Sequence, residues 1–285
     1  MAQVLSEPQV AAYRRDGFVA PVRVLSEEEA LAARARLEAI EAAYGPMHYL
    51  VKPHLVLTLA DELIRLPGLV GAVADLIGPD VMLWDSSFII KEPGEGKFVS
   101  WHQDLTYWGL EGGRDDVVSV WLALSDASEA AGCMRMVPGS HLSGMAEHVD
   151  TYSPDNVLSR GQTIRGVDES KAVAVPLRPG QMSLHHGWVF HASHPNVTND
   201  RRIGLNMNLI KPSVRQTRIP RDTATLLAGR DAYGLYDPEP RPVRDFAPEA
   251  CAAQAAISRL RGLEVSYNPA GRPVNRQVKM APAAP

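Results

Sequence analysis

The sequence predicts a mainly β protein, with a core of short strands preceded by helices and followed by one more helix. Three observations indicate this fold class. Amphipathic segments with helix-capping signals occupy residues 1–80. From Val81 onward, apolar and polar residues alternate in short runs separated by Pro-Gly and Gly turns. A final apolar-periodic segment covers residues 247–263. Helices first and many strands next are typical of an all-β core with helical additions.

The predicted helices are justified by their caps and apolar faces. A short segment at residues 8–15 ends at Asp16-Gly17, and a short strand follows at 18–20. The clearest helix starts at Ser26, where Ser26 and Glu29 form a capping box, and stops near Tyr44 before Gly45-Pro46. Residues 59–77 are predicted to be helical and split at Pro67-Gly68. The apolar residues of the clearest helix recur every three or four positions and predict a face that packs on the core: Ala30, Ala33, Leu37, Ile40 and Tyr44.

The predicted strands lie at residues 81–91, 97–100, 116–125, 134–137, 172–175, 181–185, 188–191 and 202–211. In the last strand Arg202, Asn206 and Asn208 share one face, and apolar residues take the other. Residues 142–170 show no clear period and predict a long loop, a functional lid or a disordered segment. We expect a single domain over 1–285: a helical part at 1–80, a core at about 81–211 and an extension at 212–285. A Pro-rich linker is expected at 238–242 and a disordered tail after Tyr267.

Composition excludes several classes of protein. The chain has 285 residues and a formal net charge of −4, so it favours neither nucleic acid nor an anionic membrane as a partner. Its two cysteines, Cys133 and Cys251, are typical of a reducing compartment. No signal-peptide pattern or long apolar run is present, so a soluble, cytoplasmic protein is expected. We expect a small-molecule substrate, while the sequence leaves monomer or homo-oligomer open.

A His-x-Asp motif, His102-Gln103-Asp104, follows the predicted strand at 97–100. A strand projects residues i and i+2 to the same face, so His102 and Asp104 point at one place. An imidazole and a carboxylate so placed are two of the three ligands of a facial iron triad. Taken alone, such a pair is more often a solvated surface pair than a metal site.

A second segment offers a third ligand about ninety residues downstream. It contains four histidines, and the residues alone leave open which of them completes the triad: His185, His186, His191 and His194. An arginine, Arg202, lies on the next predicted strand, where its guanidinium fork suits a carboxylate ligand.

Together these motifs resemble the phytanoyl-CoA dioxygenase (PhyH-like) family of Fe(II)- and 2-oxoglutarate-dependent oxygenases. The family pattern is H-x-D, then H-x-S-x-x-N, then an arginine, and it is similar to residues 102–104, 191–196 and 202 here. Segments 118–124, 132–141 and 177–180 extend the similarity over about residues 10–215. The resemblance implies a double-stranded β-helix, a jelly-roll or cupin-like barrel, flanked by N-terminal and C-terminal helices.

The resemblance also implies the cofactors and their ligands. Fe(II) is bound by His102, Asp104 and His191, and 2-oxoglutarate and O2 are cosubstrates, with ascorbate as the reductant in vitro. Arg202 binds the 5-carboxylate of 2-oxoglutarate. Ser193 adds a donor to that carboxylate, Trp121 flanks the cosubstrate, and Ser87 takes a similar position on an earlier strand; structural roles remain open for these three.

The implied reaction is hydroxylation of an unactivated C–H bond of a small or medium-sized substrate, with 2-oxoglutarate converted to succinate and CO2. Related halogenases have Ala or Gly at the carboxylate position, so Asp104 favours hydroxylation. Two alternatives remain: a jelly-roll protein that binds a metal or small ligand without turnover, and a zinc hydrolase, which lacks an obvious general base here. The candidate substrate residues, with the 142–170 loop and Gln103, are Tyr107, Trp108, Arg135, Asn206 and Lys52.

Overall fold

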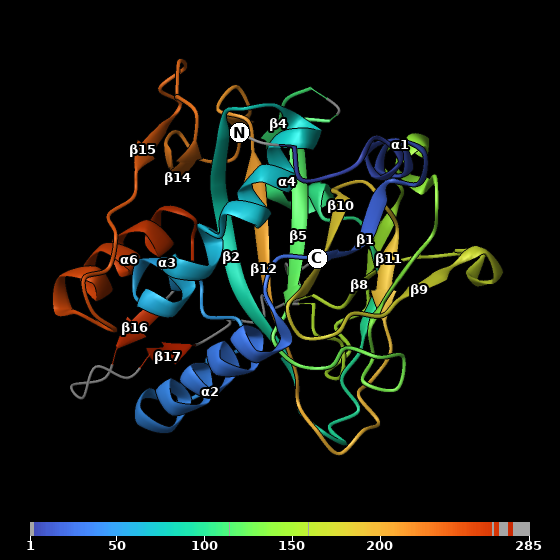
Figure 1. Ribbon diagram of the computed structural model, residues 1–285, viewed down its shortest axis with the longest axis horizontal. Helices are drawn as coiled ribbons and strands as arrows, with labels where there is room; N and C mark the ends of the chain where they lie inside the picture. Colours follow the sequence, from blue (N-terminus) through green and yellow to red (C-terminus); the bar gives the residue numbers. More distant parts are fainter. Residues whose placement is uncertain (1–2, 114, 159, 264, 268–272, 276–285) are drawn as a thin grey trace, which may run out of the picture.

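The computed structural model describes residues 3–267 and 273–275, apart from residues 114, 159 and 264. The β-sheets lie at the centre of the protein, and helices precede and follow them along the chain (Figure 1). The helices are α1 (Glu7–Asp16), α2 (Glu27–Tyr44), α3 (Thr58–Ile64), α4 (Pro67–Ile77), α5 (Leu105–Trp108) and α6 (Pro248–Leu260), with 3-10 turns η1 (Pro53–Leu55), η2 (Ser140–Ser143) and η3 (Glu169–Lys171).

Two sheets form the core. The first has seven strands in the order β1-β10-β5-β12-β2-β14-β15, and the second has four in the order β3-β11-β6-β9. Their bounds are β1 (Phe18–Arg23), β2 (Val81–Lys91), β5 (Val117–Ala123), β10 (Gln181–His186), β12 (Arg202–Ile210), β14 (Asp222–Ala228) and β15 (Tyr236–Pro238) in the first, and β3 (Val99–His102), β6 (Met134–Met136), β9 (Val173–Val175) and β11 (His191–Ser193) in the second.

Three two-stranded ribbons complete the described structure. They pair β4 (Leu110–Glu111) with β13 (Arg215–Gln216), β7 (His148–Asp150) with β8 (Gln162–Ile164), and β16 (Val265–Tyr267) with β17 (Pro273–Asn275). Apart from that last strand, the predicted disordered tail after Tyr267 lies outside the described residues.

The outer face of the seven-stranded sheet packs against the N-terminal helices. Apolar residues of β5, such as Val118, Val120 and Leu122, join the main buried cluster with residues of α2, α3 and α4. The capping box that starts α2 is present: Glu29 N–H donates to Ser26 Oγ at 3.1 Å, and Ser26 N–H donates to Glu29 Oε2 at 2.7 Å. Removing such a cap costs about 1 kcal/mol. The inner face carries polar residues such as Ser119 and Asn208 among apolar ones such as Val117 and Trp121.

Several predicted elements are confirmed. The strand predicted at 81–91 has the bounds of β2, and the helix predicted from Ser26 to Tyr44 is α2. The split predicted at Pro67-Gly68 separates α3 from α4, because Pro67 suits the first turn of a helix better than its interior.

Three predictions were wrong. Residues 142–170 are not a structureless loop: they contain the β7/β8 hairpin, paired from His148↔Ile164 to Asp150↔Gln162. The strand predicted at 188–191 begins at His191, because residues 187–190 make the turn out of β10. The extension was predicted without strands, yet β14 joins the seven-stranded sheet beside β2.

Candidate metal centre

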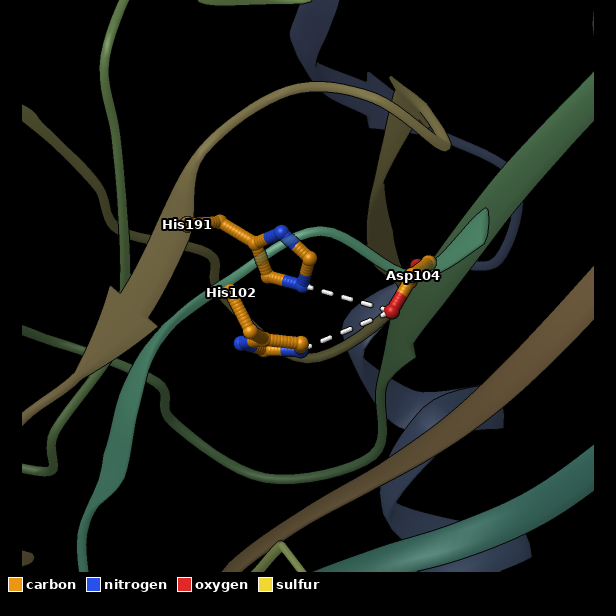
Figure 2. A group of neighbouring side chains, drawn as sticks. All are labelled: His102, Asp104 and His191. Carbon is orange, nitrogen blue, oxygen red and sulfur yellow. Dashed lines mark ion pairs between the residues drawn. The ribbon is translucent and has the colours of Figure 1, made fainter. Parts of the chain in front are cut away.

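Three side chains from two segments converge in the space between the sheets (Figure 2). His102 Nε2 lies 3.5 Å from Asp104 Oδ1, and His191 Nε2 lies 3.7 Å from the same oxygen. The two imidazole rings have centroids 4.0 Å apart. One ligand atom from each residue falls within 4.8 Å of the others, a spacing suited to one metal ion.

The strand pairing explains how the two histidines meet. β3 and β11 are antiparallel neighbours, and His102 pairs with His191 across them. Asp104 differs from the prediction in its local structure. β3 ends at His102, and Asp104 has helical dihedrals (φ −62, ψ −50) at the N-cap of α5. The turn into α5, and not strand alternation, therefore brings the carboxylate to the imidazoles.

Backbone carbonyls fix the orientation of both imidazoles. His102 Nδ1 lies 2.9 Å from Ser100 O, and His191 Nδ1 lies 3.1 Å from Val189 O. A carbonyl only accepts, so each Nδ1 carries the proton and donates it. Each Nε2 is then left with its lone pair toward Asp104 Oδ1. Such partners outside the ligand set are the usual means of orienting metal-binding histidines.

The protonation states also suit a cation. Burial, together with the neighbouring His102, lowers the pKa of His191 to about 3, so this imidazole is neutral at neutral pH. Burial raises the pKa of Asp104, but His191, His102 and His185 outweigh it and hold the pKa well below the usual range. A neutral imidazole and an ionised carboxylate are the forms that bind a metal.

Two further residues contact the other carboxylate oxygen of Asp104. Ser119 Oγ donates to Asp104 Oδ2 at 2.7 Å, and His185 Nε2 lies 3.4 Å from the same atom. They are cross-strand partners on β5 and β10, so the inner face of the large sheet supplies both. Sequence reasoning missed Ser119, because its position depends on strand register. His185 was one of the four histidines left open as the third ligand, and neither of its ring nitrogens has a hydrogen-bond partner among the described residues.

The remaining two histidines of the segment face elsewhere. His186 Nδ1 accepts the Trp188 N–H at 3.0 Å, and the His186 ring lies beside Tyr13 and His141. His194 Nε2 lies 2.8 Å from Arg135 NH1. Of the four candidates left open by the sequence, His191 is the one grouped with His102 and Asp104.

A pair of cations lies beside the three side chains. Arg202 on β12 is the cross-strand partner of Lys91 on β2, and both are buried. Burial lowers the pKa of Arg202 to about 10, and burial with the nearby Arg202 lowers that of Lys91 to about 6. No ion pair joins either cation to a carboxylate in the part of the chain that the structure describes. Sequence reasoning found Arg202 but not Lys91.

Neutral groups hold these cations in place. The Lys91 ammonium donates to Ser193 Oγ at 2.7 Å and to His194 O at 2.6 Å. Arg202 donates from NH1 to Gly132 O at 2.5 Å, while its buried Nε has no hydrogen-bond partner among the described residues. An unpaired buried N–H in a cationic fork marks a place where an anion is favoured.

Trp121 covers the arginine. The Arg202 guanidinium lies over the Trp121 ring, 4.8 Å from its centroid. The indole crosses Gly204 so closely that a Cβ there would sit 2.0 Å from the ring. Glycine at position 204 therefore lets Trp121 lie flat across β12 and under the guanidinium.

Three of the expected substrate residues, and Ser87, which was expected beside the cosubstrate, lie on the large sheet and on α5. Asn206 and Ser87 are cross-strand partners on the half-exposed inner face of the large sheet. Tyr107 and Trp108 lie on α5, directly after Asp104; Trp108 packs on Trp84, and Tyr107 on His148 of the β7/β8 hairpin. α5 thus places Tyr107 and Trp108 directly after Asp104, and Asn206 lies on β12, the strand next to that of Ser119. Gln103 instead anchors the 142–170 segment by donating to Gly144 O at 2.8 Å.

Lys52 and Arg135 were wrong as substrate candidates. The Lys52 ammonium is fully buried and pairs with Glu239 of the C-terminal extension, which also contacts His54 at 2.9 Å. Arg135 pairs with Ala192 between His191 and Ser193, so it faces the opposite side of the small sheet. There it forms an ion pair with Glu169 at 2.9 Å. Neither cation has a charge directed into the space between the sheets.

Two imidazole nitrogens and one carboxylate oxygen facing a single point are the donor set of the non-haem iron(II) oxygenases, and they lie here between two β-sheets. Fold and site thus define that class. The profile of the phytanoyl-CoA dioxygenase (PhyH) family matches residues 13–204, more than half of the chain. The protein belongs to the phytanoyl-CoA dioxygenase family.

Individual relatives agree with this assignment. A probable alpha-ketoglutarate-dependent hypophosphite dioxygenase of Stutzerimonas stutzeri is 30% identical over 152 residues, which are 53% of this chain and 52% of the relative. The chain thus spans about half the length of the curated relatives it matches. A solved non-heme monooxygenase, ThoJ in its apo form, is 36% identical with a TM-score of 0.79 over 89% of this chain and 96% of that one. CytC3 with Fe(II) and alpha-ketoglutarate is 25% identical with a TM-score of 0.61, over 82% of this chain and 93% of that chain.

Proposed function

We propose that this protein is an Fe(II)- and 2-oxoglutarate-dependent dioxygenase that hydroxylates an unactivated C–H bond of a small or medium-sized organic substrate. One observation carries the proposal. The three potential metal ligands and the two buried cations, Arg202 and Lys91, which have no carboxylate partner among the described residues, share one interior space. A metal binder without turnover needs the first feature but not the second. A site that binds iron together with a 2-oxo diacid needs both features, the ligands for the metal and the cations for the distal carboxylate.

In this proposal His102, Asp104 and His191 hold iron, which supplies the oxidative chemistry once 2-oxoglutarate and O2 are bound. Arg202 binds the 5-carboxylate through the Nε edge of its guanidinium, where Nε has no hydrogen-bond partner among the described residues. Lys91 places a second cation beside that carboxylate and orients the Ser193 hydroxyl, which lies 2.7 Å from the ammonium. Trp121 flanks the cosubstrate with the same ring face that contacts the Arg202 guanidinium.

The carboxylate of Asp104 favours hydroxylation over halogenation. It occupies the third protein position of the triad, where a halide would otherwise bind, and Ser119 and His185 support its outer oxygen. With that oxygen engaged, Asp104 presents only Oδ1 to the metal. Ser87 and Asn206 stay as candidates for contact with substrate or cosubstrate, together with Tyr107 and Trp108.

The finer architecture belongs to the same proposal. The two facing sheets are interpreted as a double-stranded β-helix within a single domain over 1–285, with a helical part (1–80), a core (81–211) and an extension (212–285). The pairing of β14 with β2 supports one domain, because β14 and β15 of the extension then complete the seven-stranded sheet of the core.

No helix in the described ranges has the length and apolar character needed to cross a membrane. A cytoplasmic location and a small-molecule substrate, with no nucleic-acid or membrane partner, are part of the proposed function.

The test is turnover of 2-oxoglutarate. Purified protein with Fe(II), ascorbate and O2 is expected to release succinate, and Asp104→Ala is expected to reduce product formation to the background rate. Asp237→Asn, an exposed residue of β15 paired with Arg221, is the control for loss of one negative charge. Absence of succinate with and without a broad substrate panel, in protein that binds one metal ion, would favour the non-catalytic binder.

A further inference from the structure

The inner face of the large sheet is polarised along β2. Lys91 and Arg202 place two cations at one end, and Asp85 places a carboxylate at the other. Asp85, Ser87 and Ile89 are half-exposed, whereas the alternate residues Ser86, Phe88 and Ile90 on the opposite face are buried. Both sides of β2 are covered here, by β12 and by residues 49–52, whose Tyr49 and Lys52 N–H groups donate to Phe88 O and Ser86 O. Solvent therefore reaches these side chains from the space between the sheets, and Asp85 is accessible from that space.

The Asp85 carboxylate has spare hydrogen-bonding capacity. Its Oδ1 accepts from the adjacent Ser86 N–H at 2.9 Å. Among the residues that the structure describes, its Oδ2 accepts no hydrogen bond. A half-buried carboxylate with one unused oxygen favours a donor that arrives with a ligand.

The nearest cation is committed to another carboxylate. Arg261, at the end of α6, donates from Nε and NH2 to the two oxygens of Asp222, each at 3.0 Å. The same NH2 donates to Trp84 O at 3.1 Å, and the guanidinium stacks on the Trp84 ring. Its NH1 approaches Asp85 Oδ1 only to 3.6 Å, which is beyond a hydrogen bond. Lys52, the other cation that interacts with Asp85, forms its ion pair with Glu239. Two cations thus serve three carboxylates, Asp85, Asp222 and Glu239, and one negative charge is left in excess.

Polar residues connect Asp85 to the metal site. Asn208 pairs with Asp85 on one side and with Ser119 on the other, and Ser119 bonds to Asp104. Two strand spacings separate Ser119 from Asp85, a span of about 10 Å. Asn206, half-exposed and 3.4 Å from the Asn208 side-chain oxygen, lies along the same path. A small molecule can span this distance with one end at Asp85 and another at the triad.

We propose that the substrate carries a cationic nitrogen group, such as a protonated amine, guanidinium or imidazolium, that binds Asp85 Oδ2 while the neighbouring Asn206 and Asn208 amides bind its polar atoms. This inference rests on the proposed function and names the substrate class of the same site. The charge pattern also separates the two ligands. An anionic cosubstrate is drawn to Lys91 and Arg202 and repelled from Asp85, whereas a cationic substrate is directed the opposite way.

The test measures binding of named probes to protein loaded with Mn(II) and 2-oxoglutarate, which does not turn over. The cationic probes are cadaverine, L-lysine, agmatine and histamine, and N-acetylcadaverine and glutarate are the neutral and anionic counterparts. Calorimetry is repeated on metal-free protein, and succinate formation is followed with Fe(II). The variants are Asp85→Asn, which keeps the shape of the side chain, and Asp237→Asn as a control of equal charge change outside this space.

At least one cationic probe is expected to bind and to stimulate succinate formation, while the neutral and anionic counterparts do neither. Asp85→Asn is expected to weaken that binding by about 10- to 150-fold, the value of one hydrogen bond to a charged group. Its 2-oxoglutarate affinity and thermal midpoint should match those of Asp237→Asn. Preference for the neutral or anionic probes, no response to any cation, or equal cation affinity in Asp85→Asn would overturn the inference. If 2-oxoglutarate itself fails to bind, the proposed function fails. The titration of the cationic probes into metal-free protein then still tests whether Asp85 binds a cation.

Discussion

The two buried cations beside the triad make a quantitative prediction for 2-oxoglutarate binding. Among the described residues Arg202 Nε has no hydrogen-bond partner, so the Nε edge of the guanidinium suits a bidentate contact, while Lys91 can add one charge-assisted bond. A hydrogen bond to a charged group contributes about 1.5–3 kcal/mol. Lys91→Met should therefore weaken 2-oxoglutarate binding about 10- to 150-fold, and Arg202→Met should weaken it by more than about 100-fold.

The assay is calorimetric titration of 2-oxoglutarate into Mn(II)-loaded protein, so that no turnover occurs. The same titration with 2-oxobutyrate, which lacks the distal carboxylate, should give equal affinities in the wild type and both variants. Lys97→Met is the matched control, because Lys97 is 42% exposed and pairs with Glu95 on the surface. Equal losses for both 2-oxo acids, or no loss for either ligand, would refute the assignment of these cations to the distal carboxylate.

A pH dependence follows from Lys91. Burial and the nearby Arg202 lower its pKa to about 6, and its protonated form is the one that a carboxylate binds. A carboxylate placed beside it raises that pKa, so binding takes up a proton above pH 6. The affinity for 2-oxoglutarate should then fall as pH rises from about 6, by up to tenfold per unit, and Lys91→Met should remove this slope. A wild-type affinity that rises with pH over the same range would contradict the sign.

Two further predictions concern the metal and the extension. Ser119→Ala should weaken Mn(II) binding about 10- to 100-fold, because Asp104 Oδ2 loses its donor at 2.7 Å. Ser119→Thr should restore the affinity. An EPR titration that gives unchanged affinity for the alanine variant would exclude this positioning role. Glu239→Gln should lower the free energy of unfolding by about 3–5 kcal/mol, because the buried Lys52 loses its counter-charge. Glu62→Gln, at an exposed ion pair, should change it by at most about 1 kcal/mol. Denaturant unfolding that gives both variants the same midpoint would show the Glu239 pair to be dispensable.

Local sequence patterns predicted the elements and ligands that depend on nearby residues. Alternating polarity gave the bounds of β2, and the capping box gave the start of α2. The order of the H-x-D and H-x-S-x-x-N motifs led to His102, Asp104 and His191, which the structure brings together. Arg202 also faces the interior, as the alternation along its strand predicts.

Features that depend on pairing between distant residues could not be predicted from the sequence. Lys52 was a substrate candidate because nothing near it in the sequence indicates its partner, Glu239, which lies 187 residues away. Lys91 and Ser119 became site candidates only once the register placed them opposite Arg202 and His185. The β7/β8 hairpin was missed because strands of three residues are too short to show a period.

The most direct test of the central claim is an anaerobic titration of Fe(II)-loaded protein with 2-oxoglutarate, followed by visible absorption. The account predicts a charge-transfer band that saturates at one iron per chain and is lost when His102 or His191 is replaced by alanine. A band of undiminished intensity in those variants, or no band in wild-type protein that holds iron, would contradict it.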